Sequence, residues 1–359
     1  MSARDQMTKR ERVEATLMLQ ETDRVPVYDI LINDDAIEHF SGRRPPVGEE
    51  GLKLRLQATA RCLDMTRMVG VAPQPPGEST DADGFVRHRD DHWIGGGIRR
   101  RPFSDEEGAK SWLAKALRGL SVPLDLKGHA EAFRADFEKC RAYLGDDTVV
   151  LHEYGPGLDW VRYSLGLELF SYLSVDAPEM IAEYIELYTQ REIQKIHATA
   201  DRALSPCALT YGDIAYKGAL MHAPKWLRRE FLPSLKRIDD ALHEHDVKCL
   251  FHSDGDITEI IPDLIAAGVD GLNPIEVVAG MDLSRVAEQY GDRLFLTGGI
   301  DISQLMANGT PDQVRQVCRR AIDDASPGYF IGSTTELDNG SRLENILAML
   351  ETAWAYRKS

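Results

Sequence analysis

The sequence lacks the features that mark membrane-spanning and secreted proteins. No run approaches the roughly 18 consecutive apolar residues that a membrane-spanning helix needs. Residues 1–6 lead into a charged segment without the apolar centre of a signal peptide. We therefore expect a cytoplasmic protein with no membrane partner.

Positive charge is also scarce. The chain has 42 Lys and Arg against 58 Asp and Glu, which gives a formal net charge of −16. Because phosphate backbones are bound by concentrated Lys and Arg, this balance argues against a nucleic acid as the main partner. Arg99, Arg100 and Arg101 form the one dense basic cluster. This cluster is either the solvated end of a hairpin or a contact for an anion.

The cysteines form no CxxC pair or other metal-spaced motif. There are five, at positions 62, 140, 207, 249 and 318. An odd number of unpaired thiols fits a reducing compartment. Cys207 and Cys249 lie inside apolar, strand-like runs, and we expect both to be small core residues.

Short apolar runs alternate with amphipathic helical segments along the whole chain. Eight runs are predicted strands: 24–31, 65–71, 148–154, 207–213, 247–255, 268–274, 293–300 and 328–334. Strands that alternate with helices favour parallel pairing, and eight of them predict an α/β fold of the (β/α)8 TIM-barrel type. An open doubly wound sheet is the alternative, but no GxGxxG follows the first strand. No change in composition marks a second domain, so residues 1–359 are predicted to form one.

Two segments depart from a plain barrel. Residues 1–22 carry a helix before the first strand, expected to plug the bottom of the barrel. Residues 72–147 are too long for a single crossover and predict an insertion after the second strand, with a β-hairpin that turns near 90–93 followed by helices. We expect this insertion to form a lid or an oligomer contact over the barrel mouth. Helices are also predicted at 178–202, 224–245 and 256–267.

Polar residues gather where the predicted strands end, which is where barrel enzymes carry their catalytic groups. They are Asp29, His152, Glu153, Asp213, Lys217, His252, Asp254, Asp256, Asn273, Glu276, Asp301, Thr335 and Glu336. Several acids and one or two histidines would therefore converge, with Lys217 and Arg162 as sources of positive charge.

The fifth strand is the most informative, because His252 and Asp254 are two positions apart and so face the same way. An imidazole and a carboxylate at a strand end are a plausible half-site for a divalent metal. The alternative is that both side chains bond to loop amides and merely end the strand.

The segment after the fourth strand is the second candidate. Asp213 and Lys217 could hold a substrate or act as an acid–base pair, with Tyr211 and Tyr216 beside them. The alternative is a surface loop that caps the following helix. Glu153 is a similar catalytic candidate. His243 and His245 lie near a helix C-terminus, where histidine complements the helix dipole, and are predicted to have no chemical role.

Four stretches together resemble the uroporphyrinogen decarboxylase superfamily. They are TKRERVEATLMLQETDRVPV at 8–27, YGDIAYKGALMHAPKWLRREFLPSLKRI at 211–238, FHSDGDITEIIPDLIAAGVDGLNPIE at 251–276 and FIGSTTELDNGSRLENILAMLE at 330–351. The resemblance covers the chain from about Thr8 to Tyr356. It implies a TIM barrel, and a homodimer as the usual assembly.

The chain departs from the true decarboxylases of this superfamily. The true decarboxylases share an arginine-rich loop after the first strand, an aspartate after the second strand and a histidine after the eighth strand. Here the corresponding segments are the acidic 28–35, then 69–71 and 332–335, which carry none of these residues. Binding a polycarboxylate next to three aspartates would be unfavourable, so decarboxylation in haem synthesis is not expected.

The chain is more similar to the methyltransferase branch, whose members move methyl groups between corrinoid proteins, coenzyme M and other acceptors and bind zinc through an HxC pair and a later cysteine. His252 is kept, but Asp254 and Thr335 stand at the two cysteine positions. A related methionine-synthase family uses a glutamate that corresponds to Glu276. The resemblance therefore implies a site of His252, Asp254 and Glu276, with Glu336 near, for zinc or another divalent metal.

Three hypotheses follow. The leading one is a methyltransferase that acts on a small molecule, with a corrinoid protein as partner and an oxygen-bound methyl donor; Asp213, Lys217, Glu153 and His252 would be catalytic. Its substrate contacts would be Asp29, Tyr211, Tyr216, Asn273 and Glu336. The second is a lyase that decarboxylates a small acid, or a porphyrinogen-type substrate, without a cofactor. The third is a barrel that binds a ligand but catalyses nothing.

Overall fold

A computed structural model describes residues 5–67, 69–93 and 96–357. Parts of three predictions lie outside the described residues. They are Met68 of the second predicted strand, Ile94 and Gly95 of the predicted hairpin, and the ends of the predicted domain at 1–4 and 358–359. Within these ranges, no helix is both long and apolar enough to cross a membrane.

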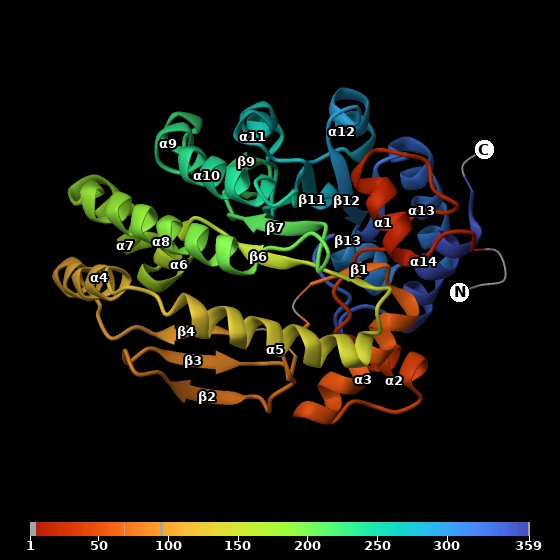
Figure 1. The fold of residues 1–359 in the computed structure, drawn as a ribbon, viewed down its shortest axis with the longest axis horizontal. Coiled ribbons are helices and arrows are strands. Elements are labelled where there is room, and N and C mark those ends of the chain that lie inside the picture. Colours follow the sequence, from red (N-terminus) through yellow and green to blue (C-terminus); the bar gives the residue numbers. More distant parts are fainter. Residues whose placement is uncertain (1–4, 68, 94–95, 358–359) are drawn as a thin grey trace.

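Parallel strands form the centre of the molecule (Figure 1). Six of them pair in the order β13-β12-β11-β10-β7-β6, and β1 pairs with β5. Their bounds are β1 (Met65–Thr66), β5 (Val149–Val150), β6 (His152–Tyr154), β7 (Cys207–Tyr211), β10 (Lys248–His252), β11 (Gly271–Ile275), β12 (Phe295–Ile300) and β13 (Tyr329–Ser333).

Residues 27–28 connect the two ends of this sheet. Val27 forms a parallel bridge with Ile331 of β13, and Tyr28 forms one with Met65 of β1. The eight predicted strands therefore all take part in the predicted (β/α)8 barrel. The first predicted strand, 24–31, is shorter than expected, because among the described residues it pairs only through isolated bridges.

Helices surround the barrel. Those between the strands are α2 (Asp34–Ser41), α3 (Glu49–Cys62), α6 (Leu158–Leu165), α7 (Leu167–Asp176), α8 (Pro178–Thr199), α9 (Pro224–Glu230), α10 (Leu232–His243), α11 (Ile261–Ala267), α12 (Leu283–Tyr290), α13 (Pro311–Ala325) and α14 (Leu343–Ala355). Shorter helical turns are η1 (Thr258–Ile260), η2 (Val277–Ala279) and the π-helical η3 (Ile302–Met306).

Two predicted helices differ from the structure near a proline. The predicted helix 224–245 is divided at Phe231 into α9 and α10, and Pro233 lies in the first turn of α10. Proline has no N–H to continue a helix and is tolerated in a first turn, so it marks a new start. In the same way Pro262 begins α11, after the short turn η1, where one helix from 256 was expected.

The N-terminal helix α1 (Lys9–Leu17) lies under the barrel. Thr8 and Glu11 form a capping box that begins it. Val13 and Leu17 pack against inward-facing residues of the strands, among them Leu209 and Phe295. Burying these side chains closes the bottom of the barrel.

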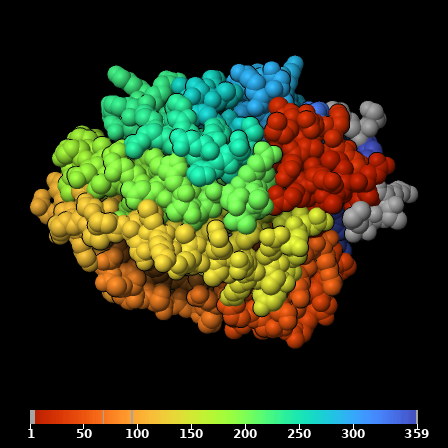
Figure 2. Space-filling model, in the orientation of Figure 1, coloured from red at the N-terminus to blue at the C-terminus, as the bar shows by residue number. Residues whose placement is uncertain are grey.

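The insertion after β1 forms an antiparallel sheet and two helices. The sheet has three strands, β2 (Gly77–Thr80), β3 (Val86–Arg89) and β4 (Gly97–Arg100), where a two-stranded hairpin was expected. The helices α4 (Glu106–Leu120) and α5 (Leu126–Leu144) follow. Figure 2 shows these residues, in orange and yellow, as a continuous band along one side of the molecule.

Candidate active site

The inward-facing side chains of the barrel change from apolar to polar within two residues. The apolar floor consists of Met65, Leu151, Leu209, Leu250, Phe295 and Phe330, together with α1. Because strand side chains alternate, the residue two positions further on faces the same way. On five of these strands, and on β11 beside them, that position carries a polar side chain: Arg67, Glu153, Tyr211, His252, Asn273 and Thr297. We call these six residues the polar layer.

Hydrogen bonds fix the orientation of His252 within the polar layer. Its Nδ1 lies 2.7 Å from Oδ1 of Asn273, whose amide in turn donates to the Thr297 hydroxyl at 2.5 Å. An amide oxygen only accepts, so Nδ1 of His252 carries the hydrogen and Nε2 presents its lone pair. Burial, helped by the charge of Arg67, lowers the pKa of His252 to about 4. The imidazole is therefore neutral at pH 7.

Two carboxylates face Nε2 of His252. It lies 3.9 Å from Oδ1 of Asp213, which follows β7, and 3.9 Å from Oδ1 of Asp254, which follows β10. Asp213 also accepts the backbone N–H of Asp254 at 3.2 Å. Burial and the negative charges of Asp213, Glu276 and Glu336 raise the pKa of Asp254 to about 7. Its Oδ1 is buried without a hydrogen-bond partner among the described residues.

Asp213, His252 and Asp254, which we call the mouth cluster, fit a divalent cation. One ligand atom from each lies within 4.8 Å of the others. Two ligand atoms bound at about 2.1 Å to one ion are at most about 4.2 Å apart, so separations of 3.9 Å suit shared coordination. One nitrogen and two oxygens favour a hard or borderline ion. A metal-binding histidine is commonly held through its other nitrogen, as Asn273 holds His252 here.

Glu276, the third predicted metal ligand, makes a different contact. Its carboxylate accepts the backbone N–H of Gly255 at 2.6 Å and so stabilises the turn after β10. It is close enough to raise the pKa of Asp254. The structure groups Asp213 with His252 and Asp254, and metal binding by Glu276 stays a prediction.

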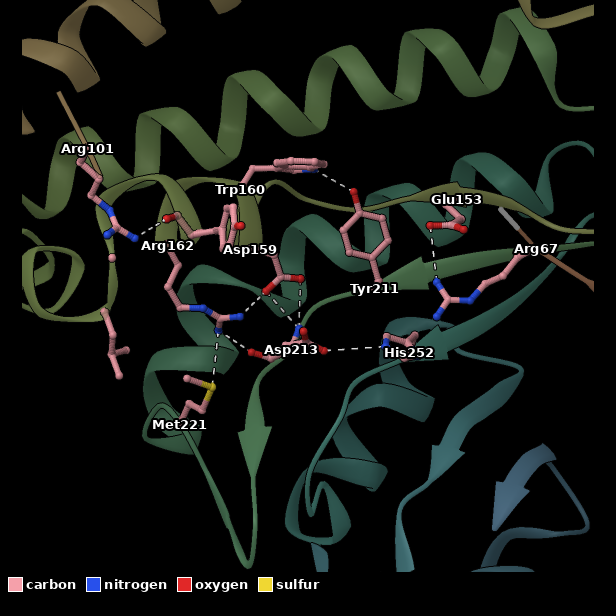
Figure 3. A pocket seen from close by; sticks show the side chains of 13 residues that line it. Arg67, Arg101, Glu153, Asp159, Trp160, Arg162, Tyr211, Asp213, Met221 and His252 are labelled. Carbon is pink, nitrogen blue, oxygen red and sulfur yellow. Dashed lines mark hydrogen bonds and ion pairs between the residues drawn. The ribbon is translucent and has the colours of Figure 1, made fainter. Parts of the chain in front are cut away.

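A cavity of about 480 Å³ opens beside the mouth cluster (Figure 3). In the figure, Arg101 lies at one end and Arg67 at the other, with Glu153 and His252 beside Arg67, and Trp160 and Tyr211 lie between the two ends. The lining residues are Arg67, Arg101, Glu153, Asp159, Trp160, Arg162, Tyr163, Gly166, Leu167, Tyr211, Asp213, Met221 and His252. The cavity is therefore charged at both ends and aromatic in the middle.

Helix α6 holds Asp213 in place. Both carboxylate oxygens of Asp159 accept the backbone N–H of Asp213 at 3.1 Å, and Arg162 donates to its carbonyl. Asp159 and Arg162 also form an ion pair. Burial raises the pKa of Asp159 to about 6, although Arg162 acts in the opposite direction.

Two arginines bring positive charge to the cavity from outside α6. Arg67 is buried and lies 3.5 Å from Glu153, whose Oε1 has no hydrogen-bond partner among the described residues. Arg101 follows β4 and donates to the carbonyls of Ser164 and Tyr163 at 2.9 and 3.0 Å. The third residue of the Arg99–Arg101 cluster thus reaches the cavity from the insertion.

Several predicted site residues lie outside the cavity lining. Lys217 and Tyr216 are exposed on the hairpin of β8 (Ala215–Tyr216) and β9 (Ala219–Leu220). Asp29 is buried, and its carboxylate accepts bonds from the N–H and hydroxyl of Ser333 and the N–H of Ile30. Burial raises the pKa of Glu336, offset in part by Arg67. Their catalytic or binding roles stay predictions.

Sequence reasoning missed two charged residues of the cavity, Arg67 and Asp159, and named Arg101 only as part of a basic cluster that is either a solvated hairpin end or a contact for an anion. Arg67 could have been found, because it lies two positions after Met65 on a predicted strand and so faces the barrel interior. Asp159 lies in a helix and Arg101 in the insertion, where strand ends give no signal.

An eight-stranded barrel with a polar layer and a metal-competent cluster at its mouth is the architecture of a barrel enzyme. The sequence model of the uroporphyrinogen decarboxylase (URO-D) family matches residues 166–356, more than half of the chain. The chain belongs to this family, as the sequence motifs predict.

Two similar proteins carry the name of methyltransferases. The methylcobamide:CoM methyltransferase MtbA of Methanosarcina acetivorans is 28% identical over 130 residues, which span 35% of this chain and 35% of the relative. Only about a third of that relative is therefore matched. A solved methyltransferase from Methanosarcina mazei superposes with a TM-score of 0.71 at 17% identity, covering 97% of this chain and 98% of that one. A likeness at this identity establishes the shared fold.

Proposed function

We propose that the protein transfers a methyl group from an oxygen atom of a small molecule, with a divalent metal held by the mouth cluster. The observation that carries this proposal is the convergence of Asp213, His252 and Asp254 beside the cavity. The kinship with methyltransferases supports the reaction class.

The residues of the mouth cluster would bind and orient. His252 would offer Nε2, since Nδ1 is committed to Asn273, and Asp213 and Asp254 would add oxygens. A bound divalent metal would act as a Lewis acid on the oxygen that gives up its methyl group. Hard ligands suit an oxygen donor better than a thiol, whose activation is favoured by thiolate-rich zinc sites. Glu153, which lies beside Arg67, would deliver a proton to the oxygen that loses its methyl group.

The cavity limits what the substrate can be. Its volume of about 480 Å³ is that of a site for a small organic molecule. Trp160, Tyr163 and Tyr211 would pack against an apolar body, and Arg101 would face an anionic group at the far end. The methyl acceptor, proposed as a corrinoid on a partner protein, would approach at the mouth.

A second candidate is the decarboxylation of a small acid. Arg67 and Arg162 could bind a carboxylate, and Asp254, with its pKa of about 7, could return a proton to the carbanion that loss of CO2 leaves. This reaction would need no metal.

Metal analysis with a methyl-transfer assay tests the proposal. We expect His252→Ala to lower the divalent metal content by about one equivalent per chain and to cut the rate of methylcobalamin formation from a methoxy compound and cob(I)alamin by about 100-fold or more. His245→Ala is the matched control, because it removes an imidazole outside the cavity. Release of CO2 from an acid by metal-depleted protein, without methyl transfer in either direction, would replace the proposal by the second candidate.

A further inference from the structure

Strand β10 also contributes to a second cluster, on the side that faces away from the barrel interior. Leu250 and His252 face inward, so Cys249 faces the helix layer and packs with Ile238 and Leu242 of α10. One ligand atom each from Cys249, His243 and Asp270 lies within 4.8 Å of the others. His243 is the last residue of α10, and Asp270 immediately precedes β11.

A fourth side chain of the same kind lies beside them. Asp239 and His243 are four residues apart on α10, which places both on one face of the helix. Both also approach the turn after α11: a Cβ at Gly268 would lie 3.4 Å from Cβ of Asp239 and 3.6 Å from Cε1 of His243. Asp239 and His243 thus approach the same turn, and the carboxyl of Asp239 also lies near the Cys249 thiol.

Asp239 is the observation that points to a ligand. It is 0% exposed, and neither of its carboxylate oxygens has a hydrogen-bond partner among the described residues. Burial raises the pKa of Asp239 well above its usual range; the Cys249 thiol and the Thr210 hydroxyl are near enough to lower it in part, but neither forms a hydrogen bond of normal geometry with its oxygens. Leaving a buried carboxyl without donors is costly, and nearly all such groups are paired in native proteins.

The side chains of His243 and Asp270 are held in place beside Cys249 by hydrogen bonds and an ion pair. Nε2 of His243 lies 2.7 Å from Oδ2 of Asp270, which also accepts the N–H of Cys249 at 2.8 Å. Lys248 pairs with the remaining oxygen of Asp270 at 2.7 Å. The side chains of His243 and Asp270 are 36% and 17% exposed, which gives an ion a path to the buried thiol and carboxylate.

We propose that His243, Cys249 and Asp270, with Asp239 beside the Cys249 thiol as a fourth donor, form a second, structural metal site for zinc or a similar borderline divalent cation. Sulfur, nitrogen and carboxylate oxygen are all ligand atoms that zinc accepts, and four is the ligand number of structural zinc sites. Binding would release the thiol proton and the proton of Asp239. The site would tie α10 to β10 and β11 behind the strand that carries His252, and it does not depend on the proposed methyl transfer.

Cobalt titration tests this site separately from the mouth cluster. The full chain carrying His252→Ala is depleted of metal and titrated with Co2+, because a thiolate bound to Co2+ gives a charge-transfer absorption that oxygen and nitrogen ligands do not. We expect one equivalent of Co2+ with this absorption, its loss on addition of Zn2+, and a higher melting temperature with either ion.

Variants then assign the ligands. In the same background, Cys249→Ala should abolish the charge-transfer absorption, whereas Cys207→Ala, which removes a buried thiol that faces the barrel interior, should keep it. His243→Gln should weaken Co2+ binding by about 10-fold or more. Because His243 is partly exposed, this variant leaves the core packed and so still tests the site if Cys249→Ala does not fold. No charge-transfer absorption in the His252→Ala protein, or an absorption that survives Cys249→Ala, would overturn the proposal, as would unchanged binding in His243→Gln.

Discussion

The two ends of the barrel handle buried charge in opposite ways. At the bottom, Asp64 is fully buried and accepts hydrogen bonds from Arg12, Arg24 and the N–H of Val27. Burial alone would raise the pKa of Asp23 nearby, but bonds from Arg12 and two backbone N–H groups outweigh it and lower the pKa to about 2. Hydrogen bonds from buried donors compensate both of these acids.

At the mouth, the acids outnumber their partners. Asp254 has a pKa raised to about 7 and an oxygen without a donor, and Glu153 also has one such oxygen among the described residues. Such under-compensated groups reduce stability and are typical of sites that bind a ligand or an ion. The buried acids at the bottom of the barrel are compensated, whereas those at the mouth have the uncompensated oxygens expected of the proposed binding site.

The largest expected effect concerns the bottom of the barrel. Asp64→Ala leaves the guanidinium groups of Arg12 and Arg24 buried without their shared carboxylate, and we expect the free energy of unfolding to fall by about 3–5 kcal/mol. At the mouth, Asp254→Asn removes an uncompensated charge and should change stability by less than about 1 kcal/mol. Denaturant unfolding of both variants measures the difference. Equal losses would remove the distinction between the two ends.

A smaller effect is expected for the residue that orients His252. Asn273→Ala removes the acceptor for Nδ1–H, and the affinity of the mouth cluster for Zn2+ should fall by about 10- to 100-fold. Asn273→Asp keeps an oxygen at this position and should retain most of the affinity. Competition with a chromophoric chelator gives both values. Wild-type affinity in Asn273→Ala would mean that the hydrogen bond does not prepare His252 for a metal.

The smallest effect concerns pH and Asp29. Burial raises its pKa to about 7, partly offset by the bonds from Ser333 and Ile30, whereas an unfolded chain has a value of about 3.9. The folded state thus holds the extra proton between these values, so the contribution to stability is full at low pH and is lost as pH rises through about 7. Relative to wild type, Asp29→Asn should gain about 2 kcal/mol between about pH 5.5 and about pH 8.5, measured by urea unfolding. If the free energy of unfolding of the variant and of the wild type changed with pH in parallel, Asp29 would ionise outside this pH range.

Much of the fold follows from the sequence, because apolar runs and amphipathic segments alternate with little interruption. All eight predicted strand segments take part in the barrel. What the pattern could not give is the extent of pairing, as at 24–31, or the third strand of the insertion. Residues 77–80 are fully exposed and so carry no hydrophobic periodicity.

The rule that catalytic residues follow strand ends predicted where the candidate site lies, but not which side chains meet there. That rule identified Asp213, His252 and Asp254, which the structure brings together, and also Lys217, which it leaves exposed. Which carboxylate faces His252 depends on the turn geometry after β7 and β10, set by contacts such as that of Asp159 with Asp213. His243 shows the same limit, because Cys249 and Asp270 become its neighbours only once α10 packs on the sheet.

The bridges of Val27 and Tyr28 bear on how the molecule is made. The segment that joins β13 to β1 is the first of the barrel to leave the ribosome, and its partner Ile331 is among the last. Until β13 has been made, residues 24–31 lack one of their two neighbouring strands, and the carboxylate of Asp29 lacks the hydrogen bonds that Ser333 donates. The ring can close only after β13 has been translated, so the complete cavity, with both Arg67 and His252 in its lining, forms only once this last strand has joined the barrel.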